Sequence, residues 1–288
     1  MNVSAQTNTL IYLYAFIPSK EYEQTELNSL EGIEAPYEVE FISFPEMTAV
    51  VTKVPEEEYS EANLQKNVEN LRWLQKKAYH HHNLMNQLHT HFTVLPLKFG
   101  TIHETKSRLE KVVENQENNI LTMLKRLKNK EEWSVKIYAD KDQFVSSFME
   151  NNSDVKKKKA EINQLSPGKQ FFAKKKMNQW IDEKAEEDMI TLCEEFHEKL
   201  EQYSMDTELK KNWEKKITGR KEEMCWNSVY LVEKNQKEQF LDCLQSKKEE
   251  AENGNIGLFY EITGPWPAYH FSQFMERGES HAAREPGK

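Results

Sequence analysis

Residues 133–148, WSVKIYADKDQFVSSF, join a β-strand directly to a helix, and this pair indicates the fold class. Apolar and polar side chains alternate from Trp133 to Tyr138, which is typical of a half-buried strand. Asp140 stands where a carboxylate can cap a helix, and Phe144 and Phe148 give that helix an apolar face. A strand followed at once by a capped helix predicts that a structural unit begins close to this stretch.

The chain after this stretch repeats the mixture of helices and strands. Ser166 and Pro167 supply the cap and first-turn proline of a helix start, and apolar residues then recur at steps of four and three as far as Tyr203. At about 1.5 Å per residue this helix would be roughly 55 Å long, so it must bend, break or project from a small domain. Three further elements are expected, namely strands at 224–232 and 256–263 and a helix over 235–250.

The residues before the opening stretch predict another mixed unit. Strands are expected at residues 10–16, 39–44, 47–54 and 92–99. One long helix should begin near Pro55, with an apolar face made by Leu64, Val68, Leu71, Ala78, Met85 and Leu88. The predicted fold class is therefore α+β in two domains, with an N-terminal α+β domain over 1–130 and a C-terminal domain over 131–271.

Two boundaries depend on local polar residues. A second helix of the first domain should begin at Thr101 or at Ser107, because each stands three residues before a glutamate as in a capping box. Its buried face is expected to contain Leu109, Val113, Ile120, Leu124 and Leu127. The tail 272–288 is polar and without an apolar period, so we predict that it is disordered.

Composition limits the classes of protein to which the chain can belong. Its 288 residues suffice for two domains, and a net charge of −9 argues against general affinity for nucleic acid. The cysteines, Cys193, Cys225 and Cys243, lack the spacing of a zinc site and the density of a disulfide scaffold, so we expect reduced thiols in the cytoplasm. No apolar run reaches the roughly 20 residues of a membrane helix, so we expect no membrane association.

No residue pattern predicts catalysis or a cofactor. The sequence contains neither a nucleophile elbow nor a phosphate-binding glycine loop, and its acids stand at salt-bridge spacing on expected helices. The run His80, His81 and His82 suggests a metal site, but successive helical positions point about 100° apart and cannot converge on one ion. We therefore expect a protein that is not an enzyme and holds no metal or cofactor.

Four successive lysines, Lys156, Lys157, Lys158 and Lys159, lie within the polar segment 151–164, which we predict to be a mobile loop. Lys169 and Lys174 to Lys176 extend this basic stretch, whereas residues 183–201 carry eight acids and two lysines. A solvated charged surface is the simpler explanation. The alternative hypothesis is that the lysines attract an acidic partner, including another copy of this chain.

Two short segments, VLPLKFGT at 94–101 and TGPWPAYHF at 263–271, cannot continue a helix because their prolines fix the backbone. Their order and spacing relative to YLYAFIP at 12–18, the strand at 133–138 and SPGK at 166–169 make the chain similar to the gas vesicle accessory proteins F and L. The resemblance covers about residues 8–271. It implies modified ferredoxin-like sheets with long amphipathic helices, in the C-terminal domain above all.

The resemblance also implies a function, which is to assist the assembly of the gas-filled protein shell. Such a protein would bind the small hydrophobic shell subunit, and it would have other accessory proteins as further partners. Leu95, Phe99, Trp266 and Tyr269 either plug the core or form a surface that receives an apolar peptide of that subunit. The alternative function is a small-molecule-binding or sensory module, and a third is a hydrolase whose residues only the fold brings together.

Overall fold

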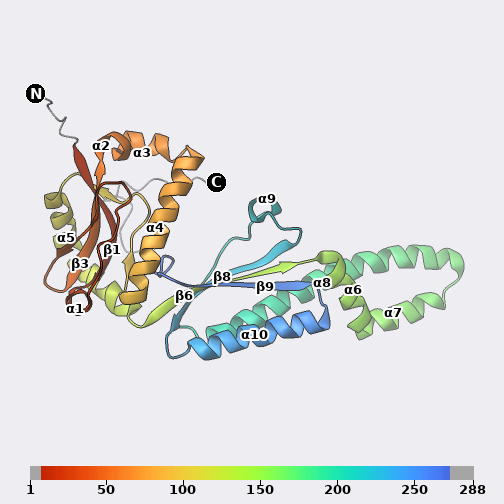
Figure 1. Cartoon of the computed structure of the whole chain (residues 1–288). Coiled ribbons are helices and arrows are strands. Elements are labelled where there is room, and N and C mark those ends of the chain that lie inside the picture. Colours follow the sequence, from red (N-terminus) through yellow and green to blue (C-terminus); the bar gives the residue numbers. More distant parts are fainter. Residues whose placement is uncertain (1–7, 273–288) are drawn as a thin grey trace, which may run out of the picture. The chain divides into compact units, whose positions relative to one another are not determined.

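The computed structural model describes residues 8–272, which form two compact units, each with its own antiparallel sheet and helices (Figure 1). Unit 1 comprises residues 8–131 and 265–272, and unit 2 comprises residues 132–264. The predicted α+β class is confirmed. The C-terminal boundary differs from our prediction of 131–271, because residues 265–272 belong to unit 1, where the Ser272 hydroxyl donates a hydrogen bond to the Pro96 carbonyl at 3.5 Å. We also predicted that the tail 272–288 is disordered, and residues 273–288 lie outside the described residues.

The sheet of unit 1 is built around β1 (Thr9–Pro18). Its strand order is β2-β3-β1-β4, and β5 also pairs with β1; the other strands are β2 (Val39–Ser43), β3 (Met47–Pro55), β4 (Leu95–Pro96) and β5 (Ile102–His103). Six consecutive residues of β1, from Tyr12 to Ile17, are fully buried, so both faces of this strand are covered. The strand predicted over 92–99 is reduced to the two residues of β4.

Unit 1 has five helices within its described residues: α1 (Ser19–Glu23), α2 (Glu56–Tyr59), α3 (Glu61–Asn67), α4 (Leu71–His91) and α5 (Lys106–Leu127). The single helix predicted from Pro55 is therefore wrong. The backbone is extended at Ser60, and Asn70 starts α4 by accepting hydrogen bonds from the amides of Arg72 and Trp73. This break leaves the Leu71 side chain 65% exposed instead of buried.

For helix α5, the sequence predicted the buried face correctly and the N-cap incorrectly. All five residues predicted for its buried face are buried. Its N-cap, however, is Thr105, whose hydroxyl accepts a hydrogen bond from the amide of Arg108 at 3.2 Å, and neither Thr101 nor Ser107 takes this position. The three-residue spacing between a hydroxyl residue and a glutamate therefore did not predict where this helix begins.

The sheet of unit 2 has the order β7-β8-β6-β9, with β6 (Lys130–Ala139), β7 (Asp206–Leu209), β8 (Glu223–Glu233) and β9 (Leu258–Trp266). Strand β7 was not predicted, because its sequence DTEL is short and charged as edge strands often are. When the helices between β6 and β7 are counted together and the four-residue helix Lys215–Thr218 between β7 and β8 is left out, the unit follows the order β-α-β-β-α-β, which is the element order of ferredoxin-like folds. In both units the first strand lies between the third and the fourth. The ferredoxin-like assignment itself stays a prediction.

The helices of unit 2 are α6 (Lys141–Asn151), α7 (Ser153–Asn163), α8 (Pro167–Glu201), α9 (Lys215–Thr218) and α10 (Lys237–Gly254). Asp140 caps α6 as predicted. The loop predicted over 151–164 is wrong, because Asn152 caps α7 and Val155 is fully buried. Helix α8 is continuous, and none of residues 167–176 is buried, so its first turns project with α7 from the rest of the unit (Figure 1).

Candidate functional site

Leu95 belongs to the core of unit 1. It pairs with Phe16 across β4 and β1, and its side chain is fully buried. The next residues hold the segment in place, since the Leu97 amide donates to the Tyr14 carbonyl at 2.9 Å. Leu95 therefore supports the neighbouring residues and presents no surface of its own.

Phe99, Trp266 and Tyr269 come together around helix α4, and we call these three residues the aromatic surface. The Phe99 and Tyr269 rings lie 5.9 Å and 6.4 Å from the imidazole of His81. The Trp266 ring lies 5.1 Å from the imidazole of His82. All three aromatic side chains are only partly buried. Two segments separated by more than 160 residues therefore bring large, partly buried aromatic rings to neighbouring histidines of the same helix.

A buried hydrogen-bond chain lies beneath the aromatic surface. The Gly100 amide donates to the Tyr12 hydroxyl at 3.1 Å, and this hydroxyl lies 2.9 Å from Nδ1 of His81. Burial lowers the pKa of His81 to about 3, with smaller effects of His80 and His82, and burial also raises the pKa of Tyr12. Both groups are therefore neutral near pH 7 and form a fixed support for the rings above them.

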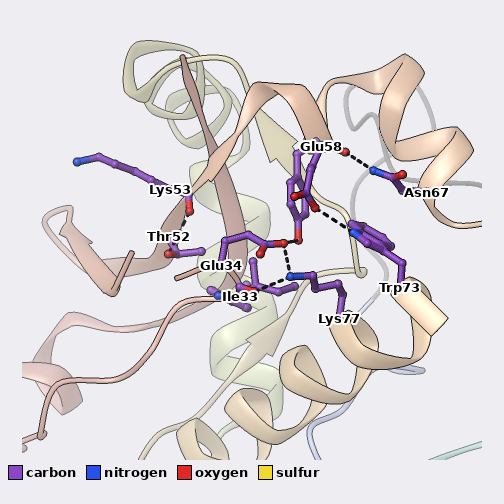
Figure 2. A network of polar contacts seen from close by, with 10 residues as sticks. Ile33, Glu34, Thr52, Lys53, Glu58, Asn67, Trp73 and Lys77 are labelled. Atoms are coloured by element: carbon purple, nitrogen blue, oxygen red, sulfur yellow. Dashed lines mark hydrogen bonds and ion pairs between the residues drawn. The ribbon is translucent and has the colours of Figure 1, made fainter. Parts of the chain in front are cut away.

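A second polar network ties the segment before β2 to α4 (Figure 2). The Lys77 ammonium forms an ion pair with the Glu34 carboxylate and donates to the Ile33 carbonyl at 3.2 Å. The Tyr59 hydroxyl donates to Glu34 at 2.6 Å, and the pKa of Tyr59 is raised by burial and then by this hydrogen bond. On the other side of the segment, the Ile33 amide donates to the Tyr14 hydroxyl at 2.9 Å. The network fixes a stretch without regular structure against the core.

Neither network was predicted from the sequence. A weak signal exists, because Trp73, Lys77 and His81 stand four residues apart and so share one face of α4. The indole of Trp73 continues this row and donates to the Glu58 carboxylate at 3.0 Å (Figure 2). Their partners lie on α2, on the segment before β2 and on β1, and follow no period, so only the fold could identify them.

The four predicted lysines, Lys156 to Lys159, lie on α7 in unit 2, and all of them are exposed. Lys157 forms an i,i+3 ion pair with Asp154 at 3.5 Å, and the Lys158 ammonium lies 4.7 Å from the centre of the Trp180 ring. They therefore belong to a different unit from the aromatic surface. The predicted site residues consequently form two separate sets.

Two further features of unit 2 were missed in the sequence. Phe171 and Phe172 in the first turns of α8 are 69% and 68% exposed, although they are large and apolar. A groove of about 290 Å³ lies between α6 and α8, lined by Phe144, Ser147, Phe148, Asn151, Asn152, Asp188, Leu192 and Ile256. Burial, and then the nearby Glu195, raise the pKa of Asp188.

The described residues 8–272 contain no group of three or more His, Cys, Asp or Glu residues placed to hold a metal ion. None of the helices in this range is long and apolar enough to cross a membrane. The three cysteines are free thiols, and the Sγ atoms of Cys193 and Cys225 are 3.9 Å apart.

Comparisons with known proteins agree with this description. The profile of the family described as gas vesicle synthesis protein GvpL/GvpF matches residues 10–273. The chain is 24% identical to gas vesicle protein L of Streptomyces sp. strain CB03234 over 243 residues, which is 84% of this chain and 86% of that protein.

Solved structures support the fold. The crystal structure of GvpF from Anabaena sp. PCC7120 matches with a TM-score of 0.65 at 18% identity, over 93% of this chain and 100% of that one. GvpF from Microcystis aeruginosa matches with a TM-score of 0.59 at 17% identity, over 92% and 99% of the two chains. Because the family profile spans nearly all of the chain, this protein belongs to the gas vesicle synthesis protein GvpL/GvpF family.

Proposed function

We propose that this protein binds the small hydrophobic shell subunit of the gas vesicle through its aromatic surface, Phe99, Trp266 and Tyr269. Bound in this way, the subunit is kept from aggregating until polymerisation buries its apolar face. The protein thereby assists the nucleation or growth of the vesicle and stays with it in the cytoplasm as a minor component of the shell. Other gas vesicle accessory proteins are further partners. Membership of a gas vesicle family that is not a known enzyme family supports this role.

The single observation that carries the proposal is the convergence of three partly buried aromatic rings on α4. Tryptophan and tyrosine are enriched among the residues that dominate binding energy, because each buries a large area at a small entropic cost. The neutral Tyr12–His81 pair beneath them holds the rings in place before the partner arrives. The net charge of −9 keeps the complex dispersed in water.

The lysines of α7 offer a second, electrostatic contact. Lys156 to Lys159 are exposed and would attract an acidic part of the shell subunit or of another accessory protein. Reversing these four charges should weaken that association and reduce its dependence on salt. An unchanged association constant and salt dependence would remove the lysines from the proposal.

The test is to co-express the chain with the shell subunit and to measure how much subunit remains in the soluble fraction. Phe99→Ala and Trp266→Ala should lower this fraction, whereas Tyr79→Ala should not. Tyr79 is a matched control because it is a 69% exposed aromatic residue of the same helix α4 that is not part of the aromatic surface. Hydrogen exchange of the β1 amides in each variant shows whether unit 1 is still folded. If subunit solubility is the same with and without the wild-type chain, the proposal fails.

The second candidate function, a small-molecule-binding or sensory module, rests on the groove between α6 and α8. Its volume of about 290 Å³ is near the lower end of ligand pockets, and Asp188 has a perturbed pKa there. A metabolite that protects unit 2 from thermal unfolding, and whose effect is lost in Asp188→Asn, would favour this candidate.

A further inference from the structure

Helix α8 has an outer face whose two ends are apolar. Ile181 is buried in the core of unit 2, and Phe172 and Ile190 stand nine residues before and after it. Nine residues at about 100° each amount to about two and a half turns, so both side chains point away from the core. They are 68% and 46% exposed. Single exposed apolar residues are common, but here two of them mark the ends of one helical face.

The charges on this face are arranged with opposite signs on either side of Ile181. Lys175 and Lys176 stand six and five residues before it, and Glu186 and Glu187 stand five and six residues after it. All four side chains are exposed. Neither lysine forms an ion pair with any residue in the range 8–272, and Glu187 pairs only with Lys184 of its own helix in this range, through an exposed contact that contributes little.

We propose that two copies of this protein pair through the outer faces of α8, antiparallel and related by a twofold axis close to Ile181. In this register Lys176 faces Glu187 of the second copy, and Lys175 faces its Glu186, because these residues lie on the same flank of the outer face. Phe172 packs against Ile190 of the second copy at each end, about 27 Å apart along the helix. Each contact occurs twice, as a self-complementary twofold interface requires.

The distribution of charge favours a second copy over other occupants. An anionic membrane or a purely acidic protein would attract the lysines, but it would repel the glutamates about three turns further along the same face. Only a surface that carries the same sequence of charges in reverse satisfies both halves. The pairing involves unit 2 alone and does not depend on binding of the shell subunit.

The test uses two variants of the full chain, Lys175→Glu/Lys176→Glu and Glu186→Lys/Glu187→Lys. The wild type should dimerise in sedimentation equilibrium, with weaker association at high salt. Each variant alone places like charges opposite one another and should dimerise at least about tenfold more weakly. An equal mixture of the two restores all four attractive pairs, so it should recover the wild-type dissociation constant. This recovery cannot be explained by misfolding of either variant.

The apolar contact has its own matched pair of variants. Phe172→Ala should weaken dimerisation, whereas Phe171→Ala removes an equally exposed ring that points about 100° around the helix and should have a smaller effect. Three results would overturn the proposal: a wild type that is monomeric up to its solubility limit, a dimer that the charge reversals leave unchanged, or a mixture no tighter than its components. Binding to anionic vesicles by a chain that stays monomeric would also overturn it and identify a lipid surface as the partner.

Discussion

Replacing Lys77 with methionine tests the polar network that fixes the segment before β2. The Lys77 and Glu34 side chains are only 7% and 14% exposed, and they form an ion pair in which Lys77 also bonds to the Ile33 carbonyl. Methionine keeps the length and helix propensity of lysine while it removes the charge. The Glu34 carboxylate would then remain buried, with only the Tyr59 hydroxyl as its donor in the network.

The expected loss of stability follows from this geometry. Removing one partner of a buried ion pair costs about 3–5 kcal/mol, because the other charge stays buried without compensation. We expect about 3 kcal/mol for Lys77→Met, since Tyr59 still bonds to Glu34 and the carboxylate is not wholly excluded from water. The double variant Lys77→Met/Glu34→Gln should cost less than the sum of the single variants, by about 1–3 kcal/mol.

Hydrogen exchange measured on peptides from each unit is the suitable assay, because a global melt would mix the transitions of two units. Amides of β1 between Tyr12 and Ile17 report on unit 1, and amides of β8 in unit 2 serve as the internal control. Exchange should accelerate in β1 and stay unchanged in β8. A loss below about 1 kcal/mol, or single variants that add within about 0.5 kcal/mol, would refute the reasoning.

Three further results are expected. Leu95→Ala should destabilise unit 1 by about 2–5 kcal/mol, measured by hydrogen exchange of the β1 amides, because it opens a cavity in the core, and a loss below about 1 kcal/mol would contradict the core position. Burial lowers the pKa of His81 to about 3 in the folded protein, against about 6.5 in the unfolded chain. The free energy of unfolding should therefore fall by up to about 1.4 kcal/mol per pH unit as the pH drops below about 6.5. If His81→Phe loses stability equally steeply with falling pH, this residue is not the cause. Gly257→Ala should lower the melting temperature, because φ is +78° at this position and a Cβ would lie 2.8 Å from the Phe144 amide nitrogen. The control Gly168→Ala, whose Cβ would meet nothing within 4 Å, should raise stability by about 0.4–1 kcal/mol. Equal effects of the two substitutions would refute the steric argument.

The sequence predicted the structure correctly where a regular spacing of apolar residues, or a local cap, defines one strand or helix. The alternation around Trp133, the cap at Asp140 and the stripe of α8 through Ile181 follow from local geometry, and the structure confirms each of them. The resemblance of the two proline-containing segments likewise indicated the family correctly. In all these cases periodicity within one element, or the order of short segments along the chain, suffices.

Local signals failed where distant residues decide the conformation. The break at Asn70 and the helical state of residues 153–163 depend on short caps inside polar stretches that also suit loops. The charged edge strand β7 has no apolar alternation, and only its pairing with β8 makes it a strand. Propensity is too weak in such segments to oppose tertiary contacts.

The sequence by itself therefore determined the α+β class, the buried faces of α5 and α8, and the family. Only the tertiary structure decided that residues 265–272 belong to unit 1, that Leu95 is buried, and that Phe99 and Tyr269 meet at His81. The physical reason is that periodicity along one element fixes which of its sides is buried. Which distant side chains meet is set by how strands pair and helices pack, because those contacts join residues that are unrelated in sequence position.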